Sequence, residues 1–145
     1  ININCSNFQK SKVFYEMLGF KVYWPVPETN TTEIANAVGM PSYQVEGALM
    51  ELQNAQQRMV IDLLEWKSPR DDSSPYPNLH RPGLSRVALA SADIDADYAY
   101  LVDQGVEVVS APVNVAMSET SHARFFCFKD PDGTFLELVQ VITTD

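Results

Sequence analysis

The sequence predicts an α+β fold built from two βαβββ modules in tandem, and three observations support this prediction. The first is an internal repeat: residues 3–22 and residues 89–108 both run from an apolar stretch through a polar cap and a helical pattern to a glycine and a second apolar stretch. The second is that strand-like segments follow each copy of the repeat. The third is a segment rich in proline, serine and aspartate, residues 67–83, which predicts a connector between the halves.

The first module is predicted to begin with an apolar strand and a helix. Four apolar side chains at helical spacing mark the helix, Ser6 or Asn7 can cap its start, and Gly19 stands where a left-handed C-terminal cap is expected. Further strands are expected near residues 20–25, 46–53 and 58–65.

A short insertion interrupts the symmetry between the second and third strands of this module. Residues 31–39 predict a short helix, capped by Thr31 or Thr32 and ending at Gly39. It could form a lid over a pocket or pack on the outside, and the sequence leaves both open.

The second module repeats the pattern. Asp93 is the predicted cap of its helix, and Gly105 aligns with the glycine of the first module at an offset of 86 residues. Strands are expected near residues 106–110, 123–129 and 134–142, with a turn at Asp-Pro-Asp-Gly before the last of them.

Length and charge limit the class of protein. A chain of 145 residues favours a single domain over residues 1–145, with the first module at residues 1–66 and the second at residues 84–145. Nineteen acidic against ten basic side chains give a formal charge of −9. Nucleic acids and anionic membranes are therefore not expected as partners, because both need a basic surface. No apolar run approaches the roughly 20 residues of a membrane span.

The cysteines favour a reducing compartment. Cys5 and Cys127 are too few for a disulfide framework and lack the spacing of metal ligands. No signal-peptide pattern is seen at the start of the chain, and we expect a cytoplasmic protein.

Two segments carry a resemblance to a known family. SNFQKSKVFYEMLGF (residues 6–20) and FKDPDGTFLELVQ (residues 128–140) resemble the opening helix and the closing hairpin of the vicinal oxygen chelate superfamily, which includes glyoxalases, bleomycin-resistance proteins and extradiol dioxygenases. The resemblance covers nearly the whole chain. It implies a glyoxalase-like fold, in which the two modules form a cupped mixed β-sheet with the helices on its convex side.

Strand alternation sorts the residues that would face this cup. In the opening strands of the two modules it places Asn2, Asn4 and Arg86 toward the cup. Asp62 and Glu137 are charged residues inside otherwise apolar strands, and a buried carboxylate needs a cation, a metal or several hydrogen-bond donors. We therefore expect Asp62, Arg86 and Glu137 to converge in one site.

The resemblance implies a divalent metal held by one ligand from each of four strands, but this chain departs from that pattern. Glu137 matches the fourth ligand and Asp62 the second, whereas the third position is Arg86 and the first would precede Ile1. A guanidinium has no lone pair for a metal. No cofactor is therefore expected, and a divalent metal held by Asp62 and Glu137 is the open alternative.

Arg86 admits two interpretations that do not exclude each other. It could replace the metal's charge by bridging Asp62 and Glu137, or it could bind a ligand oxygen through two of its N–H groups.

The resemblance implies a small-molecule enzyme of the lyase or isomerase type, in which Glu137 is the catalytic proton shuttle and Arg86, Asp62, Asn2 and Asn4 bind substrate. The alternative is a metal-free binding or sequestration protein of the bleomycin-resistance type. In that case the acidic chain would attract a cationic drug at an interface between two subunits of a homodimer.

Overall fold

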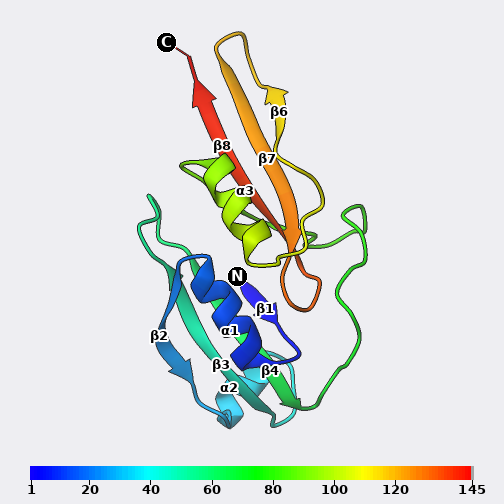
Figure 1. Ribbon diagram of the computed structural model, residues 1–145. Helices are drawn as coiled ribbons and strands as arrows, with labels where there is room; N and C mark the ends of the chain where they lie inside the picture. Colours follow the sequence, from blue (N-terminus) through cyan, green and yellow to red (C-terminus); the bar gives the residue numbers. More distant parts are fainter. Residues whose placement is uncertain (145) are drawn as a thin grey trace. The chain divides into compact units, whose positions relative to one another are not determined.

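Two βαβββ units make up the chain, as the computed structural model shows for residues 1–144 (Figure 1). The first unit comprises residues 1–73, and the second begins at Ser74. Within the described residues, no helix has the length and apolar character that crossing a membrane requires. The predicted α+β fold class is confirmed.

The first unit is a four-stranded mixed sheet with a helix on one face. The strand order is β1-β4-β3-β2; β1 runs parallel to β4, and the other neighbours are antiparallel. The helix α1 packs against β2 and β4, and the short helix α2 stands between β2 and β3 in the chain. The bounds are β1 Asn2–Asn4, α1 Phe8–Met17, β2 Phe20–Val26, α2 Thr32–Ala37, β3 Gln44–Leu52 and β4 Val60–Ser68.

The second unit has the same topology. Its strand order is β5-β8-β7-β6, with β5 parallel to β8 and α3 packed against β8. The bounds are β5 Val87–Ala90, α3 Ile94–Asp103, β6 Val113–Ala116, β7 Ser121–Lys129 and β8 Phe135–Thr143.

The predicted caps begin and end the helices. Asn7, rather than Ser6, accepts a hydrogen bond from the Lys10 amide at the start of α1, and Asp93 does the same for Ala96 at the start of α3. The glycines that follow α1 and α3 have φ of 97° and 75°, the left-handed conformation that a C-terminal cap requires. Thr31 caps α2.

One predicted strand is wrong. The apolar residues 106–110 do not form a strand, and Val108 makes only an isolated bridge to Phe128. The chain bends after Val108, and Pro112, which has no N–H to donate, precedes the regular ladder that β6 forms with β7. The run therefore meets β7 only at this bridge, where Lys129 N donates to the Glu107 carbonyl and Val109 N to the Cys127 carbonyl, and the regular edge strand forms later.

Each sheet buries the face that carries its helix. In the first unit, Tyr15 of α1 meets Phe20 edge to face, and in the second, Tyr98 of α3 meets Phe126 in the same way. Apolar side chains from the strands fill the space under the helices; those almost fully buried are Phe20, Met50, Ile61, Leu63, Phe126, Phe128 and Leu136.

The opposite face of the second sheet, which we call the distal face, follows from strand register. Residues paired across a sheet point to the same side, so the pairs Cys127–Glu137, Phe125–Val139 and Ala123–Val141 share one face, turned away from α3. Their neighbours in β5 and β6 complete it. The distal face thus includes Ala88, Ala90, Val113, Val115, Ala123, Phe125, Cys127, Lys129, Phe135, Glu137, Val139 and Val141.

Glu65, which the sequence analysis did not single out, joins β4 to the start of α1. Its Oε2 accepts a hydrogen bond of 2.8 Å from the Phe8 amide, and its Oε1 lies 2.6 Å from Lys67 Nζ and 3.3 Å from an Arg70 nitrogen. Burial alone would raise the pKa of Glu65, but the hydrogen bonds from Lys67, the Phe8 amide and Arg70 outweigh burial and lower it. In the second unit, Gln140 occupies the corresponding place and accepts from the Ile94 amide.

The charge of Glu65 is expected to stabilise the fold in a pH-dependent manner. Because its pKa is lower in the folded state, this contribution is present above the ordinary pKa of about 4.3 and is lost as the pH falls through the lowered value. We predict that Glu65→Gln lowers the free energy of unfolding at pH 7 by about 1–2 kcal/mol. Denaturant titrations should show the difference shrinking toward pH 3. The matched control is Glu119→Gln, an exposed glutamate; equal effects of the two substitutions would contradict the prediction.

Candidate functional site

An ion pair between Arg86 and Glu137 forms the centre of the candidate site. Arg86 Nε donates to Glu137 Oε2 at 2.6 Å. Glu137 stands in the middle of β8, paired with Ala88 of β5, and only 9% of it is exposed. The Arg86 side chain, which directly precedes β5, is 41% exposed. A buried carboxylate is thereby matched by a cation that still reaches solvent.

Arg86 keeps most of its donors for another molecule. A guanidinium has five N–H groups, and the pair with Glu137 uses the one on Nε. The two Nη groups make no hydrogen bond to any residue within 1–144. They form the planar fork that binds a carbonyl, carboxylate or phosphate oxygen.

Cys127 is the third member of this cluster, and the sequence analysis missed it. It lies directly opposite Glu137 in the β7–β8 ladder, with its Sγ 3.9 Å from Glu137 Oε2. Burial raises the pKa of the Cys127 thiol, the Glu137 charge raises it further, and Arg86 opposes both. The residue is thus a neutral thiol and a weak donor rather than a nucleophile. The signal was present in the sequence. The Asp130–Gly133 turn fixes the register of the β7–β8 hairpin, and this register places Cys127 opposite Glu137.

Asp62 holds the same position in the first unit that Glu137 holds in the second. Asp62 pairs with Asn2 of β1, as Glu137 pairs with Ala88 of β5. Its Oδ1 is buried and has no hydrogen-bond partner among the described residues. Burial raises the pKa of Asp62, and the positive charge of the amino terminus at Ile1 together with a hydrogen bond from Asn2 offsets this only in part. A carboxylate oxygen in this state favours binding of a donor or a cation.

Asn2 and Asn4 lie on the side of β1 away from the core, as strand alternation predicted. Ile3 between them is buried, whereas both asparagines are exposed. Asn2 donates from Nδ2 to the Asp62 carbonyl at 2.9 Å, and Asn4 Oδ1 accepts from Trp66 Nε1 at 2.9 Å. Asn4 therefore helps to fix the indole of Trp66.

The structure brings the predicted residues together within each unit. Asn2 is next to Asp62 in the first unit, and Arg86 is bonded to Glu137 in the second. The expected convergence of Asp62 with the Arg86–Glu137 pair stays a prediction.

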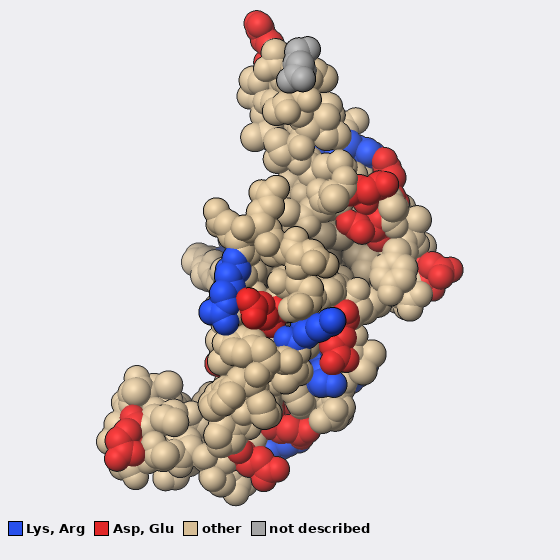
Figure 2. All heavy atoms as spheres, turned by 90° about the vertical axis from the view of Figure 1, so that its left-hand side faces the viewer, with Lys and Arg blue, Asp and Glu red and all other residues tan. Residues whose placement is uncertain are grey.

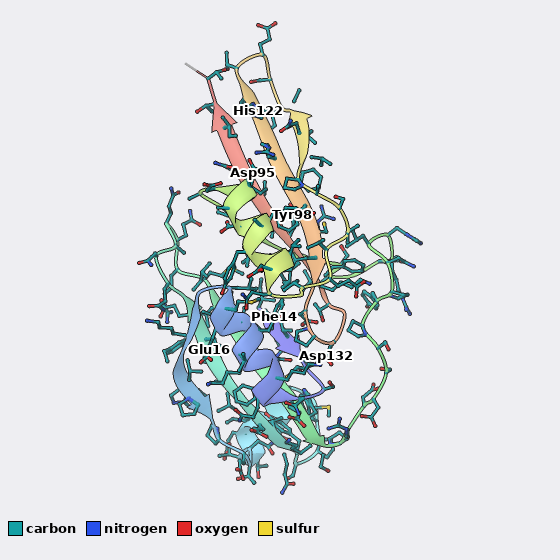
Figure 3. The ribbon with its side chains drawn as sticks, viewed as in Figure 1. Phe14, Glu16, Asp95, Tyr98, His122 and Asp132 are labelled. Carbon is teal, nitrogen blue, oxygen red and sulfur yellow. The ribbon has the colours of Figure 1, made fainter. Side chains whose placement is uncertain are left out.

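The helix-bearing face of the second sheet is separate from the site. Arg124 on β7 forms a two-pronged ion pair with Asp95 in the first turn of α3, and Arg124 lowers the pKa of Asp95. Figure 3 shows Asp95 and Tyr98 on α3 and His122 on β7. His122 has the same strand parity as Arg124 and so points away from the distal face.

The residues present do not fit the metal site that the resemblance implies. Arg86 occupies the third ligand position, and its cation is bonded to Glu137, the fourth. Within residues 1–144, no group of three or more His, Cys, Asp or Glu side chains could hold a metal ion. A catalytic metal site normally supplies at least three protein ligands. The side chains of this site are therefore not assigned as metal ligands.

Most of the basic side chains elsewhere on the surface are paired with an acidic one. On the face shown in Figure 2, the visible basic side chains lie beside acidic ones. The ion pairs of the described residues include Lys67 with Glu46, Arg58 with Glu51 and Lys129 with Glu107.

Comparison with known proteins connects this geometry to a family. The family model described as Glyoxalase/Bleomycin resistance protein/Dioxygenase superfamily matches residues 1–138. A comparison with curated proteins finds no significant match.

Solved structures share the fold. A glyoxalase family protein from Bacillus cereus is similar at 20% identity and a TM-score of 0.78, covering 98% of this chain and 91% of that one. One from Enterococcus faecalis has 25% identity and a TM-score of 0.57, covering 96% and 93%. An antibiotic binding protein from Streptomyces sp. CB03234 has 25% identity and a TM-score of 0.59, covering 97% and 91%.

We predict that Arg86 is what keeps a metal out of the second unit. Arg86→His removes the cation and supplies an imidazole beside Glu137 and Cys127, which makes three donors of the kind zinc prefers. Elemental analysis after zinc loading should find about one zinc per chain in this variant and substoichiometric zinc in the wild type. Arg124→His, on the other face, is the control with the same charge change. Stoichiometric zinc in the wild type would overturn the prediction.

Proposed function

The chain belongs to the Glyoxalase/Bleomycin resistance protein/Dioxygenase superfamily, and on that premise we propose that it is a glyoxalase-like enzyme of the lyase or isomerase type, acting on a small molecule with oxygens on adjacent carbons. The observation that carries this proposal is the Arg86–Glu137 pair. It places a fixed cation with free donors next to a buried carboxylate, in one unit of the fold.

The pair supplies the two groups that proton transfer next to a carbonyl requires. Arg86 binds the carbonyl oxygen of the substrate through its Nη groups. Glu137 takes the proton from the neighbouring carbon, and the electron pair of the broken C–H bond moves onto the oxygen held by Arg86. The hydroxyl proton on the neighbouring carbon passes to the oxygen held by Arg86, so that this oxygen becomes the new hydroxyl and the other becomes the new carbonyl. Glu137 then returns its proton to the former carbonyl carbon, so that the product is an isomer and no co-reactant is consumed.

The remaining predicted residues extend this proposal. Asp62, Asn2 and Asn4 are assigned to substrate binding. Support for Asp62 comes from its buried and unpartnered oxygen, to which a substrate hydroxyl can donate. The cytoplasmic location and the homodimer belong to the proposal as well, and the buried state of both cysteine thiols is consistent with a reducing compartment.

A second function, binding without chemistry, is favoured by one structural relative. The Streptomyces protein of similar fold is described as an antibiotic binding protein. Binding would use the same Arg86 donors but would need no proton transfer by Glu137. The formal charge of −9 favours a cationic ligand, whereas Arg86 disfavours one at this site.

Hydrogen exchange in a probe substrate separates the two functions. We predict that the protein catalyses exchange of the hydroxymethylene protons of 2-hydroxyacetophenone in D2O, followed by proton NMR. Because Glu137 is the base, Glu137→Gln should slow catalysed exchange by about 100-fold or more. Arg86→Gln should also slow it, whereas Arg124→Gln, which removes a cation from the opposite face, should leave it unchanged.

Two outcomes would contradict the enzymatic proposal. Exchange that persists in Glu137→Gln would remove the assigned base. Saturable binding of 2-hydroxyacetophenone in calorimetry, without exchange above the rate in buffer, would favour the binding function instead.

A further inference from the structure

The geometry points to a substrate class that the proposed function leaves open: we infer that the ligand of the second unit has a flat, apolar body attached to the oxygen-bearing head that Arg86 binds. This inference rests on the proposed function for the oxygen-bearing head of the ligand, and it adds that the rest of the ligand is flat and apolar. It is carried by the part of the distal face that continues from Glu137 along β8, β7 and β6.

Two consecutive rows of this face are entirely apolar. The row next to Glu137 consists of Val139, Phe125 and Val113, and the following row of Val141, Ala123 and Val115. Three of these side chains are well exposed, with 43% of Val113, 44% of Val115 and 58% of Val141 accessible to solvent. Exposed apolar side chains scattered singly are ordinary, but adjacent rows of them mark a binding surface.

The size of the apolar area suits a small molecule. From Glu137 to Val141 the strand advances four residues, which is about 13 Å, and three neighbouring strands span about 10 Å. Two fused aromatic rings cover such an area. The oxygen-bearing head of the ligand, held by Arg86 beside Glu137, would then lie at one end of its apolar body.

The charges on and around the distal face determine which charge the head group of the ligand can carry. Glu137 is neutralised by Arg86, whose Nη donors stay free of protein partners within residues 1–144. The row on the other side of Glu137 consists of Phe135 and Lys129, and Lys129 is itself paired with Glu107 at 2.6 Å. The arrangement therefore favours an anionic or carbonyl head and disfavours an ammonium group.

Affinity for three probes tests the inference. We expect 2-naphthoate, with an apolar body and a carboxylate, to bind at least about tenfold more tightly than acetate, which has the head alone. It should also bind more tightly than 2-naphthylmethylammonium, which has the body with the opposite charge. Calorimetric titration of the full chain measures all three.

Matched substitutions locate the body. Val139→Thr and Val113→Thr keep the shape of the side chain but place a hydroxyl under the ligand, and each should weaken 2-naphthoate binding about fivefold. The control, Val102→Thr, changes an exposed valine of α3 and should alter affinity less than twofold. Thermal unfolding of each variant verifies that the fold is retained.

The outcomes separate the inference from the proposed function. Equal affinity for acetate and 2-naphthoate, with loss of both in Arg86→Gln, would overturn the apolar body and leave the head site standing. Binding of 2-naphthoate that depends on Val139 but not on Arg86 would support the apolar body and count against the assigned head. Tighter binding of the ammonium probe than of 2-naphthoate would overturn the inference. It would also be overturned if 2-naphthoate failed to bind and Val139→Thr dissociated a dimer, because the apolar rows would then be a subunit interface.

Discussion

A buried carboxylate in the middle of a strand is the constraint on which the second unit depends. Glu137 loses most of its contact with water, a loss that costs several kcal/mol unless a cation or several donors replace the solvent. Arg86 provides that cation at 2.6 Å, from the residue just before the neighbouring strand. The same contact excludes a third metal ligand from this position and leaves the Nη groups available. Both the mismatch with the metal pattern and the proposed chemistry therefore follow from one ion pair.

The two units show how one backbone plan takes on different tasks. Asp62 and Glu137 occupy equivalent register positions, yet Glu137 is paired with a cation whereas one oxygen of Asp62 is buried without a partner. The start of each helix shows a second difference. The amide at the start of α1 is bound by the charged Glu65, whereas the amide at the start of α3 is bound by the neutral Gln140. The two units therefore share a topology that positions equivalent residues, and the identity of those residues determines what each unit can bind.

Local signals in the sequence predicted much of the fold and singled out Arg86 and Glu137, which the structure shows bonded to each other. The features that the sequence did not reveal have physical reasons. The caps Asn7 and Asp93 act through hydrogen bonds within one helical turn, which a short stretch of sequence reveals. Alternation placed Asn2 and Asn4 on the side of β1 opposite the buried Ile3, because a strand has a period of two. The edge strand β6 was misplaced because its pairing with β7 depends on where a bend ends. Glu65 was overlooked because its partner, the Phe8 amide, is 57 residues away.

The central claim, that the Arg86–Glu137 pair and the adjoining apolar rows bind one ligand, is tested most directly by NMR. The side-chain Nε–H signal of Arg86 and the methyl signals of Val113, Val139 and Val102 can be followed while 2-naphthoate is added. The account predicts that the signals of Arg86, Val113 and Val139 shift together along one saturation curve while that of Val102 stays in place. Shifts confined to other residues, or a response of Arg86 alone, would contradict it.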